Sequence, residues 1–349
     1  MKKFTFFWMA ACALVAAALV ACSKDDAPAP QDEPEFYTVQ LGWDGEILDV
    51  VGYEPLTRAT TNDVYGIQVY STPDIELEEG EVVDWTPFAY GLFDDPNNIS
   101  VNLLKGYKYK FVATMVKDGK TKLNYNTTSG FSNPFNVHQS TSKLENIFNY
   151  SPTPFTSLSR GGSYLKIKTD TGYSSKSYSI PNTDRYYGEF EGYTPGASGE
   201  KVNIKMKRAS FGVKFIVKGK LANSGTLHIN MVGAPAMKLA LTNSDNQISE
   251  IFTFDNVYAA WDKNKYTENI EMTISWTRSD GTTVPLGSTF SITCKRNATT
   301  VVHINIENDG QGGKLGLEID ETGDPVADGE NDITITDGEV VDTDVDTNK

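Results

Sequence analysis

The chain is poor in cysteine, with only three among its 349 residues. Cys12 lies in an N-terminal stretch that we expect to be removed, and Cys22 directly follows that stretch. Cys294 is therefore left without a partner for a disulfide. We expect it to be a small buried apolar residue in a strand, because unpaired cysteines are commonly buried. The folded chain must then be stabilised by core burial and by hydrogen bonds in sheets.

The sequence also lacks recognisable catalytic and metal-binding motifs. Its three histidines are far apart, and none lies at metal-ligand spacing from another histidine or from a cysteine. It contains no nucleophile elbow, zinc-protease motif, phosphate-binding loop or dinucleotide fingerprint. We therefore predict that the protein is not an enzyme and holds no cofactor or metal. A glycosidase site made of carboxylates on distant strands is a catalytic arrangement that a single sequence leaves open.

Long apolar runs are absent after the N-terminus, since no later segment has the roughly 20 apolar residues of a membrane helix. Lys2 and Lys3 precede the uncharged apolar stretch 4–20, which is typical of a secretory signal. The sequence Leu-Val-Ala-Cys at 19–22 resembles the lipobox of bacterial lipoproteins. We predict a signal peptide over 1–21, lipidation of Cys22 and attachment to the outer membrane through the lipid. The alternative is an ordinary cleaved signal followed by an incidental cysteine.

Positive charge is scarce, and the net charge is −15. This balance argues against binding to nucleic acid. Most of the excess lies in residues 309–349, which contain thirteen acidic and two basic residues, a net charge of −11 (2 − 13). We expect this acidic tail to be partly disordered, although its short β-type patterns could also pair with a sheet edge. The Pro-rich and acidic segment 22–35 predicts a flexible tether.

Short strands recur about every ten residues from position 36 onward. Tyr37, Val39, Leu41 and Trp43 alternate with less apolar residues, as expected for a half-buried strand. Two Asp-Gly pairs, at 118–119 and 280–281, predict hairpins. Long amphipathic helices are absent, and the best helix candidate is the short segment 142–148. We predict an all-β protein with two tandem antiparallel β-sandwiches, at 36–160 and 161–308.

Aromatic residues suggest an alternative function. Several of them gather in the second half of the sequence and could form a platform for stacking sugar rings: Tyr186, Tyr187, Phe190, Tyr193, Tyr258 and Trp261. A sandwich also needs aromatic residues in its core. The alternative that follows is a glycan-binding surface lipoprotein of a polysaccharide-uptake system.

The segment 55–62 links the first two strands and contains a basic residue in a polar stretch of small residues. A protease could reach Arg58 there and cut before Ala59. Cleavage would detach the lipid together with the first strand. The loss of Tyr37, Val39, Leu41 and Trp43 would leave a groove that a strand of another subunit could fill.

These features together resemble the fimbrillins of Bacteroidetes, which are pilus subunits exported as lipoproteins. The resemblance rests on Cys22 with its lipobox, the segment 57–59, the strand 64–70 and the segment 206–215, and covers most of residues 22–308. It implies two transthyretin-like sandwiches, proteolytic removal of an N-terminal strand at an arginine and assembly by strand exchange. The implied protein is a structural or adhesive pilus subunit on the outer cell surface. Its partners would be other subunits and a host or bacterial surface ligand.

The acidic tail departs from the simplest fimbrillin plan, in which C-terminal strands supply the donor. The resemblance therefore leaves three roles open for this chain. It could polymerise, cap a pilus or remain a monomeric surface lipoprotein.

Overall fold

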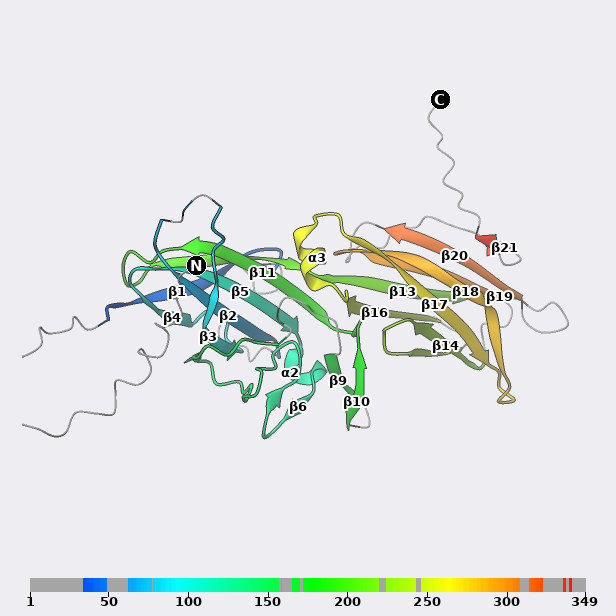
Figure 1. Cartoon of the computed structure of the whole chain (residues 1–349). Helices are drawn as coiled ribbons and strands as arrows, with labels where there is room; N and C mark the ends of the chain where they lie inside the picture. The colour runs from blue at the N-terminus through cyan, green and yellow to red at the C-terminus, as the bar shows by residue number, and fades with distance from the viewer. Residues whose placement is uncertain are drawn as a thin grey trace, which may run out of the picture. The chain divides into compact units, whose positions relative to one another are not determined.

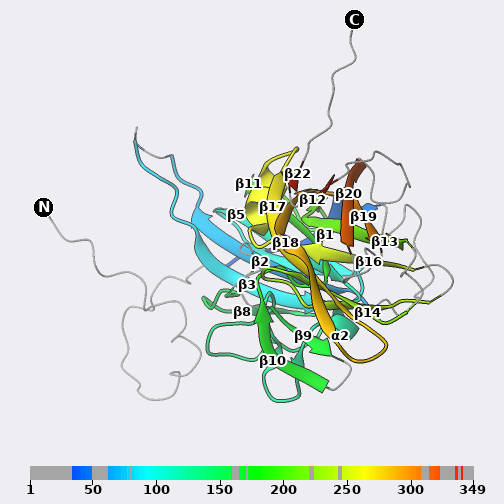
Figure 2. The ribbon, with the colours of Figure 1, turned by 90° about the vertical axis from the view of Figure 1, so that its right-hand side faces the viewer.

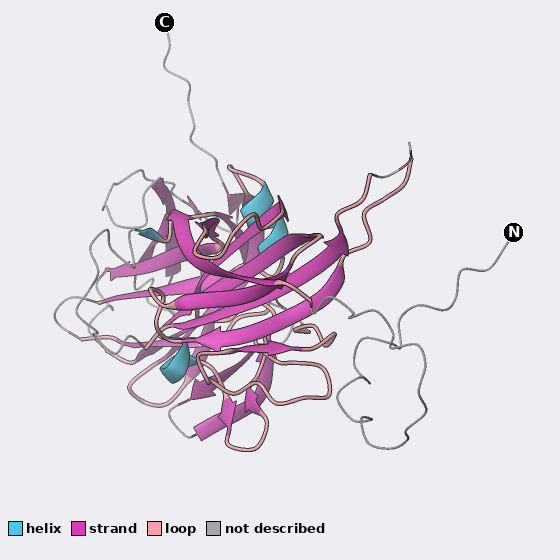
Figure 3. Ribbon diagram, turned by 90° about the vertical axis from the view of Figure 1, so that its left-hand side faces the viewer, coloured by secondary structure: helices cyan, strands magenta, loops and turns pink. Residues whose placement is uncertain are grey.

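Strands are the main secondary structure of the computed structural model, with two short helices among the residues it describes, α2 (Gly119–Lys122) and α3 (Val257–Asp262) (Figure 3). The described residues are 34–48, 62–76, 78, 80–156, 158, 165–169, 172–219, 224–242, 246–307, 314–322, 335–336 and 339–340. The predicted all-β sandwich fold is confirmed. Cys22, Arg58 and Ala59 lie outside the described residues.

The first half is built around one sheet of eight strands in the order β4-β1-β12-β11-β5-β2-β3-β8. Their bounds are β1 (Phe36–Gly45), β2 (Val64–Pro73), β3 (Thr86–Phe93), β4 (Ile99–Leu104), β5 (Tyr107–Lys117), β8 (Phe148–Tyr150), β11 (Asp184–Tyr193) and β12 (Lys201–Arg208). The sheet curls so that its two edge strands, β4 and β8, come close to each other. The backbone N–H of Asn102 in β4 donates to the hydroxyl of Tyr150 in β8 at 2.8 Å. Side chains on the inner face enclose one core, which includes Val39, Leu41 and Phe111.

The outer face of this sheet is covered by the segment between β5 and β11. It contains α2 and two small sheets, made of β6 (Tyr125–Asn126) with β7 (Gly130–Phe131), and β9 (Leu165–Thr169) with β10 (Gly172–Tyr178). Phe131, Phe135 and Phe155 of this segment are buried in a second core. That core continues into the second half of the chain.

The second half contains two sheets, in the orders β16-β13-β19-β20-β21-β22 and β15-β14-β17-β18 (Figure 1). Their bounds are β13 (Ser210–Lys218), β14 (Thr226–Met231), β15 (Met237–Ala240), β16 (Gln247–Thr253), β17 (Thr267–Thr277), β18 (Thr283–Lys295), β19 (Thr299–Glu307), β20 (Lys314–Thr322), β21 (Ile335–Thr336) and β22 (Glu339–Val340). Apolar side chains from both sheets share one core, in which Cys294 is fully buried as expected. Figure 2 shows these strands from the end of the molecule.

The change from the first sheet to the second half occurs at Ala209, between β12 and β13. Strands β11 and β12 pair with strands of the first half, although they follow the boundary expected at residue 160. The sheet boundary and the expected domain boundary therefore do not coincide. Residues 36–349 form one compact unit.

Two local predictions were wrong. No helix forms at 142–148, where the chain is irregular and bends at Asn146 (φ +58°) before it enters β8. The segment is held by neighbours instead: Ser142 Oγ accepts from the backbone N–H of Val137, and its carbonyl accepts from the N–H of Phe131. The pair Asp118-Gly119 begins α2 and does not close a hairpin. The pair Asp280-Gly281 does close the predicted hairpin between β17 and β18.

Candidate functional site

The candidate site begins at β1, which lies inside the first sheet between two partners. It runs antiparallel to β4, with Leu41 opposite Ile99, and parallel to β12, with Gln40 opposite Lys201. Both sides of its backbone therefore take part in pairing with neighbours, as a central strand requires. Removal of β1 would leave a slot between β4 and β12, which we call the β1 slot.

The four side chains predicted to fill this slot are buried to different extents. Val39 is fully buried and Leu41 is 3% exposed, while Tyr37 and Trp43 are half-buried. The Trp43 ring lies 5.4 Å from the ring of Tyr65, and its Nε1–H donates to the carbonyl of Pro96 at 2.9 Å. Complete burial of one such side chain contributes about 1.5–3 kcal/mol. These contacts give β1 a strong noncovalent hold on the rest of the sheet.

The chain leaves β1 at Gly45, whose φ of +81° lies in the left-handed region that favours glycine. An added Cβ at this position would lie 2.7 Å from the carbonyl oxygen of Met206. The next residue, Glu46, donates its backbone N–H to that same carbonyl at 2.9 Å. The sharp turn thus places Glu46 at the end of β12.

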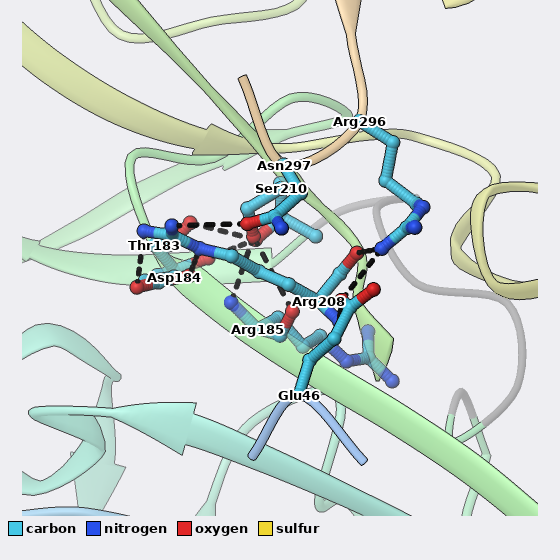
Figure 4. Close-up of polar contacts among 9 residues, drawn as sticks. Glu46, Thr183, Asp184, Arg185, Arg208, Ser210, Arg296 and Asn297 are labelled. Atoms are coloured by element: carbon cyan, nitrogen blue, oxygen red, sulfur yellow. Dashed lines mark hydrogen bonds and ion pairs between the residues drawn. The ribbon is translucent and has the colours of Figure 1, made fainter. Parts of the chain in front are cut away.

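A polar junction lies where β12 ends and β13 begins (Figure 4). Oε2 of Glu46 accepts from the backbone N–H of Arg208 at 2.8 Å and from Nη1 of Arg296 at 2.7 Å. The Arg296 side chain is only 8% exposed, and its Nη1 also donates to the Arg208 carbonyl at 3.0 Å. Arg296 belongs to the turn between β18 and β19. Glu46 therefore connects the end of β1 to the second half of the chain.

The other charges of the junction are paired separately. The guanidinium of Arg208 binds both carboxylate oxygens of Asp184 at 2.8 Å. Burial lowers the pKa of Arg208, but the pair with Asp184 raises it more, so that its pKa lies above the ordinary value. Since Asp184 is engaged in this bidentate pair, Glu46 is the carboxylate that faces Arg296.

Arg185 lies beneath the junction and is completely buried. Its Nε–H donates to Oγ1 of Thr114 at 2.8 Å, and its Nη2–H donates to the carbonyl of Leu158. Burial lowers the pKa of Arg185 to about 9, because the low-dielectric interior disfavours its charged form. Its contacts join β11 to the segment that covers the outer face of the first sheet.

The six aromatic residues considered as a sugar platform do not gather on one face. Tyr186 packs into the inner core of the first sheet, while the neighbouring Tyr187 faces the opposite side and is also fully buried. The Tyr187 ring packs against the rings of Tyr258 and Trp261 at 6.4 and 5.5 Å. Three of the six residues, Tyr187, Tyr258 and Trp261, thus join β11 to α3, whereas Tyr193 packs against Phe111 and Phe190 is exposed.

In the part of the chain that the structure describes, no group of three or more His, Cys, Asp or Glu side chains could hold a metal ion. None of the helices described there is long and apolar enough to span a membrane.

The sequence patterns identified the inward-facing residues of β1 but missed Glu46, Arg208 and Arg296. A glutamate after Asp-Gly carries no signal of its own, because most such residues are exposed to solvent. Glu46 and Arg296 are 250 residues apart in sequence. Only the fold brings them together.

No family model matches the sequence, and no curated protein does. Several solved structures are similar over most of the chain. One is a proposed cell adhesion protein from Bacteroides eggerthii (14% identity, covering 82% of this chain and 95% of that chain, TM-score 0.36). Another is a proposed adhesin from Bacteroides ovatus (10% identity, 88% and 96% covered, TM-score 0.38). A third is the tip fimbrial protein Mfa3 from Porphyromonas gingivalis with a C-terminal truncation (9% identity, 82% and 100% covered, TM-score 0.31).

Proposed function

We propose that this chain is a fimbrillin-type subunit of the cell surface, with a structural or adhesive role, which assembles by strand exchange after β1 is removed. The proposal includes export as a lipoprotein and lipidation of Cys22, which would hold the subunit at the outer membrane before processing. In the assembled state, the partners would be other subunits of a pilus.

The observation that carries the proposal is the position of β1. This strand lies between two others, contributes Val39 and Leu41 to the core, and is joined to β2 through residues 46–63, which include Arg58. One cut in this connection would separate β1, together with everything N-terminal to it, from the rest of the chain. The fragment would then be held only by noncovalent contacts.

An empty β1 slot would be unfavourable. A strand with matching alternation would cover the exposed apolar residues of the slot and the unpaired edges of β4 and β12 again. Replacement of β1 by a strand from another subunit forms contacts of the same kind, so the exchange costs little free energy. The exposed apolar residues and unpaired strand edges of an empty slot therefore strongly favour assembly with another subunit.

The experiment is limited digestion of the full chain with an arginine-specific protease, followed by N-terminal sequencing and size-exclusion chromatography with light scattering. We expect a product that starts at Ala59 and forms higher oligomers, and we expect Arg58→Ala to remain monomeric. Arg160→Ala is the matched control, because it removes another arginine that is outside the described residues and should leave assembly intact. An Ala59 product that stays monomeric at high concentration would refute strand exchange.

A further inference from the structure

The junction at the end of the β1 slot contains a preformed site for a carboxylate. Two donors converge on Oε2 of Glu46, namely the backbone N–H of Arg208 and Nη1 of Arg296, at 2.8 and 2.7 Å (Figure 4). Hydrogen bonds between charged partners are stronger than those between neutral groups. The carboxylate of Glu46 is therefore bound at a specific position in the junction.

Both donors stay in place when β1 leaves, since they belong to β12 and to the turn between β18 and β19. The Arg296 guanidinium is also held by the Arg208 carbonyl at 3.0 Å. The following residue, Asn297, is fixed by its backbone N–H, which donates to the Ser210 carbonyl at 2.8 Å. Without β1, the Arg296 guanidinium would keep the Arg208 carbonyl as a partner but would lose its carboxylate.

We propose that Arg296 and the backbone N–H of Arg208 form a carboxylate-recognition site that selects the strand occupying the β1 slot. The strand must end in a glycine followed by an acidic residue. The glycine is needed because Gly45 adopts φ +81° and has no room for a Cβ beside Met206. The acid is needed to satisfy Arg296. This inference rests on the proposed strand exchange and specifies which strand a second copy can offer.

The chain contains one C-terminal segment with the required spacing. In β1, the aliphatic residues at 39 and 41 are followed by the pair Gly45-Glu46, and Leu317, Ile319 and Gly323-Asp324 repeat this spacing. Leu315 also falls at the position of Tyr37. We therefore assign residues 315–324 of a second copy as the occupant. Part of this segment, β20, pairs with β19 in the structure and would exchange that partner for the slot.

The test uses the full chain with a site for a sequence-specific protease placed in the connection 49–61, so that it does not depend on cleavage at Arg58. After cutting, the rate at which the β1 fragment leaves is followed by size-exclusion chromatography and mass spectrometry. We expect Glu46→Gln to release the fragment about tenfold faster, because the substitution removes the charge from the acceptor of two hydrogen bonds. Asp44→Asn is the matched control, because Asp44 is an exposed acid two residues away, and should change the rate less than about twofold.

The role of Arg296 is tested by repeating Glu46→Gln in the Arg296→Met background, where the substitution should have no further effect. Equal release from Glu46→Gln and Asp44→Asn would overturn the proposal, even if Arg296→Met does not fold. An effect of Glu46→Gln that persists without Arg296 would overturn it as well.

The occupant is tested with a synthetic peptide of residues 314–325 added to the cut protein. The peptide should displace the β1 fragment, and its Asp324→Asn form should bind about tenfold more weakly. Failure of both peptides would refute the assignment of the occupant. If the Ala59 product stays monomeric but Glu46→Gln still speeds release, strand exchange is wrong and the site serves only to retain β1.

Discussion

The first strands of the two halves have the same topological role but are attached to the chain differently. β1 pairs antiparallel with β4 and parallel with β12, the last strand of its sheet in sequence. β13 pairs antiparallel with β16 and parallel with β19. However, β13 follows β12 after a single residue, Ala209, whereas β1 is joined to β2 through residues 46–63. The two strands are therefore paired alike but attached differently. One cut after β1 releases it from the rest of the fold, whereas β13 would stay covalently joined to β12.

The two halves also differ in the chemistry of their cores. The first sheet buries several tyrosines, among them Tyr65, Tyr109 and Tyr187, each fully inaccessible to solvent. Among the residues described in the second half, the buried aromatic residues are phenylalanines and Trp276. Burial disfavours the charged phenolate, so a buried tyrosine must remain neutral, and we expect the first half to be the more sensitive to alkaline pH.

The largest expected effect is the loss of stability above pH 10. Burial raises the pKa of Tyr65, Tyr109 and Tyr187 far above the ordinary value of 10. The unfolded chain therefore loses these protons first, and the stability that is complete below pH 10 falls by about 1.4 kcal/mol per tyrosine for each further pH unit. The three tyrosines together give a loss of roughly 4 kcal/mol per pH unit above 10.

Single-tryptophan variants would separate the halves in this experiment. Trp43 reports on the first half through its contact with Tyr65, and Trp276 reports on the second half. Urea unfolding at pH 9 is the control, and at pH 11 we expect the Trp43 transition to shift to lower urea than the Trp276 transition. Coincident shifts would mean that the halves unfold as one unit, and the contrast between their cores would then have no consequence for stability.

A smaller effect is expected at the seams where the first strands meet their parallel partners. Both seams contain a glycine, but Gly45 has φ +81° and would place a Cβ 2.7 Å from a backbone oxygen, whereas a Cβ on Gly212 would meet the side chain of Thr299. Gly45→Ala should cost about 1–3 kcal/mol of unfolding free energy, because both the backbone conformation and the contact are unfavourable. Gly212→Ala should cost less, since Thr299 can change rotamer. Urea titration of the two variants tests the order, and the reverse order would contradict it.

Much of the fold follows from local patterns in the sequence. The alternation of Tyr37, Val39, Leu41 and Trp43 identified β1 and its inward face, because side chains on a strand alternate with period two. The absence of long amphipathic helices correctly indicated an all-β fold. These features depend only on neighbouring residues, so a single sequence contains them.

The remaining features depend on partners that are distant in the sequence. The parallel pairing of β1 with β12 brings together Gln40 and Lys201, and the Glu46–Arg296 ion pair joins two halves of the chain. Nothing in the local sequence around these residues predicts such pairings. The segment 142–148 was misread for the same reason, since its contacts with Val137 and Phe131 replace the helical hydrogen bonds.

The smallest effect concerns the two Asp-Gly pairs for which hairpins were predicted, one in each half. Gly281 has φ +86° in the hairpin between β17 and β18, where an added Cβ would meet nothing within 4 Å. Gly281→Ala should therefore cost about 1–2 kcal/mol through backbone strain alone.

Gly119 lies in α2 next to Asp118, whose backbone N–H donates to Oδ1 of Asp63 at 2.9 Å, a contact that holds this pair in a helical turn. Alanine is favoured over glycine in a helix by up to about 1 kcal/mol, and the contact of its Cβ with Val64 at 3.1 Å offsets this gain. Gly119→Ala should therefore change the unfolding free energy by less than about 0.5 kcal/mol. Urea titration of both variants checks the difference, and a larger loss from Gly119→Ala would show that packing against Val64 decides the geometry at α2.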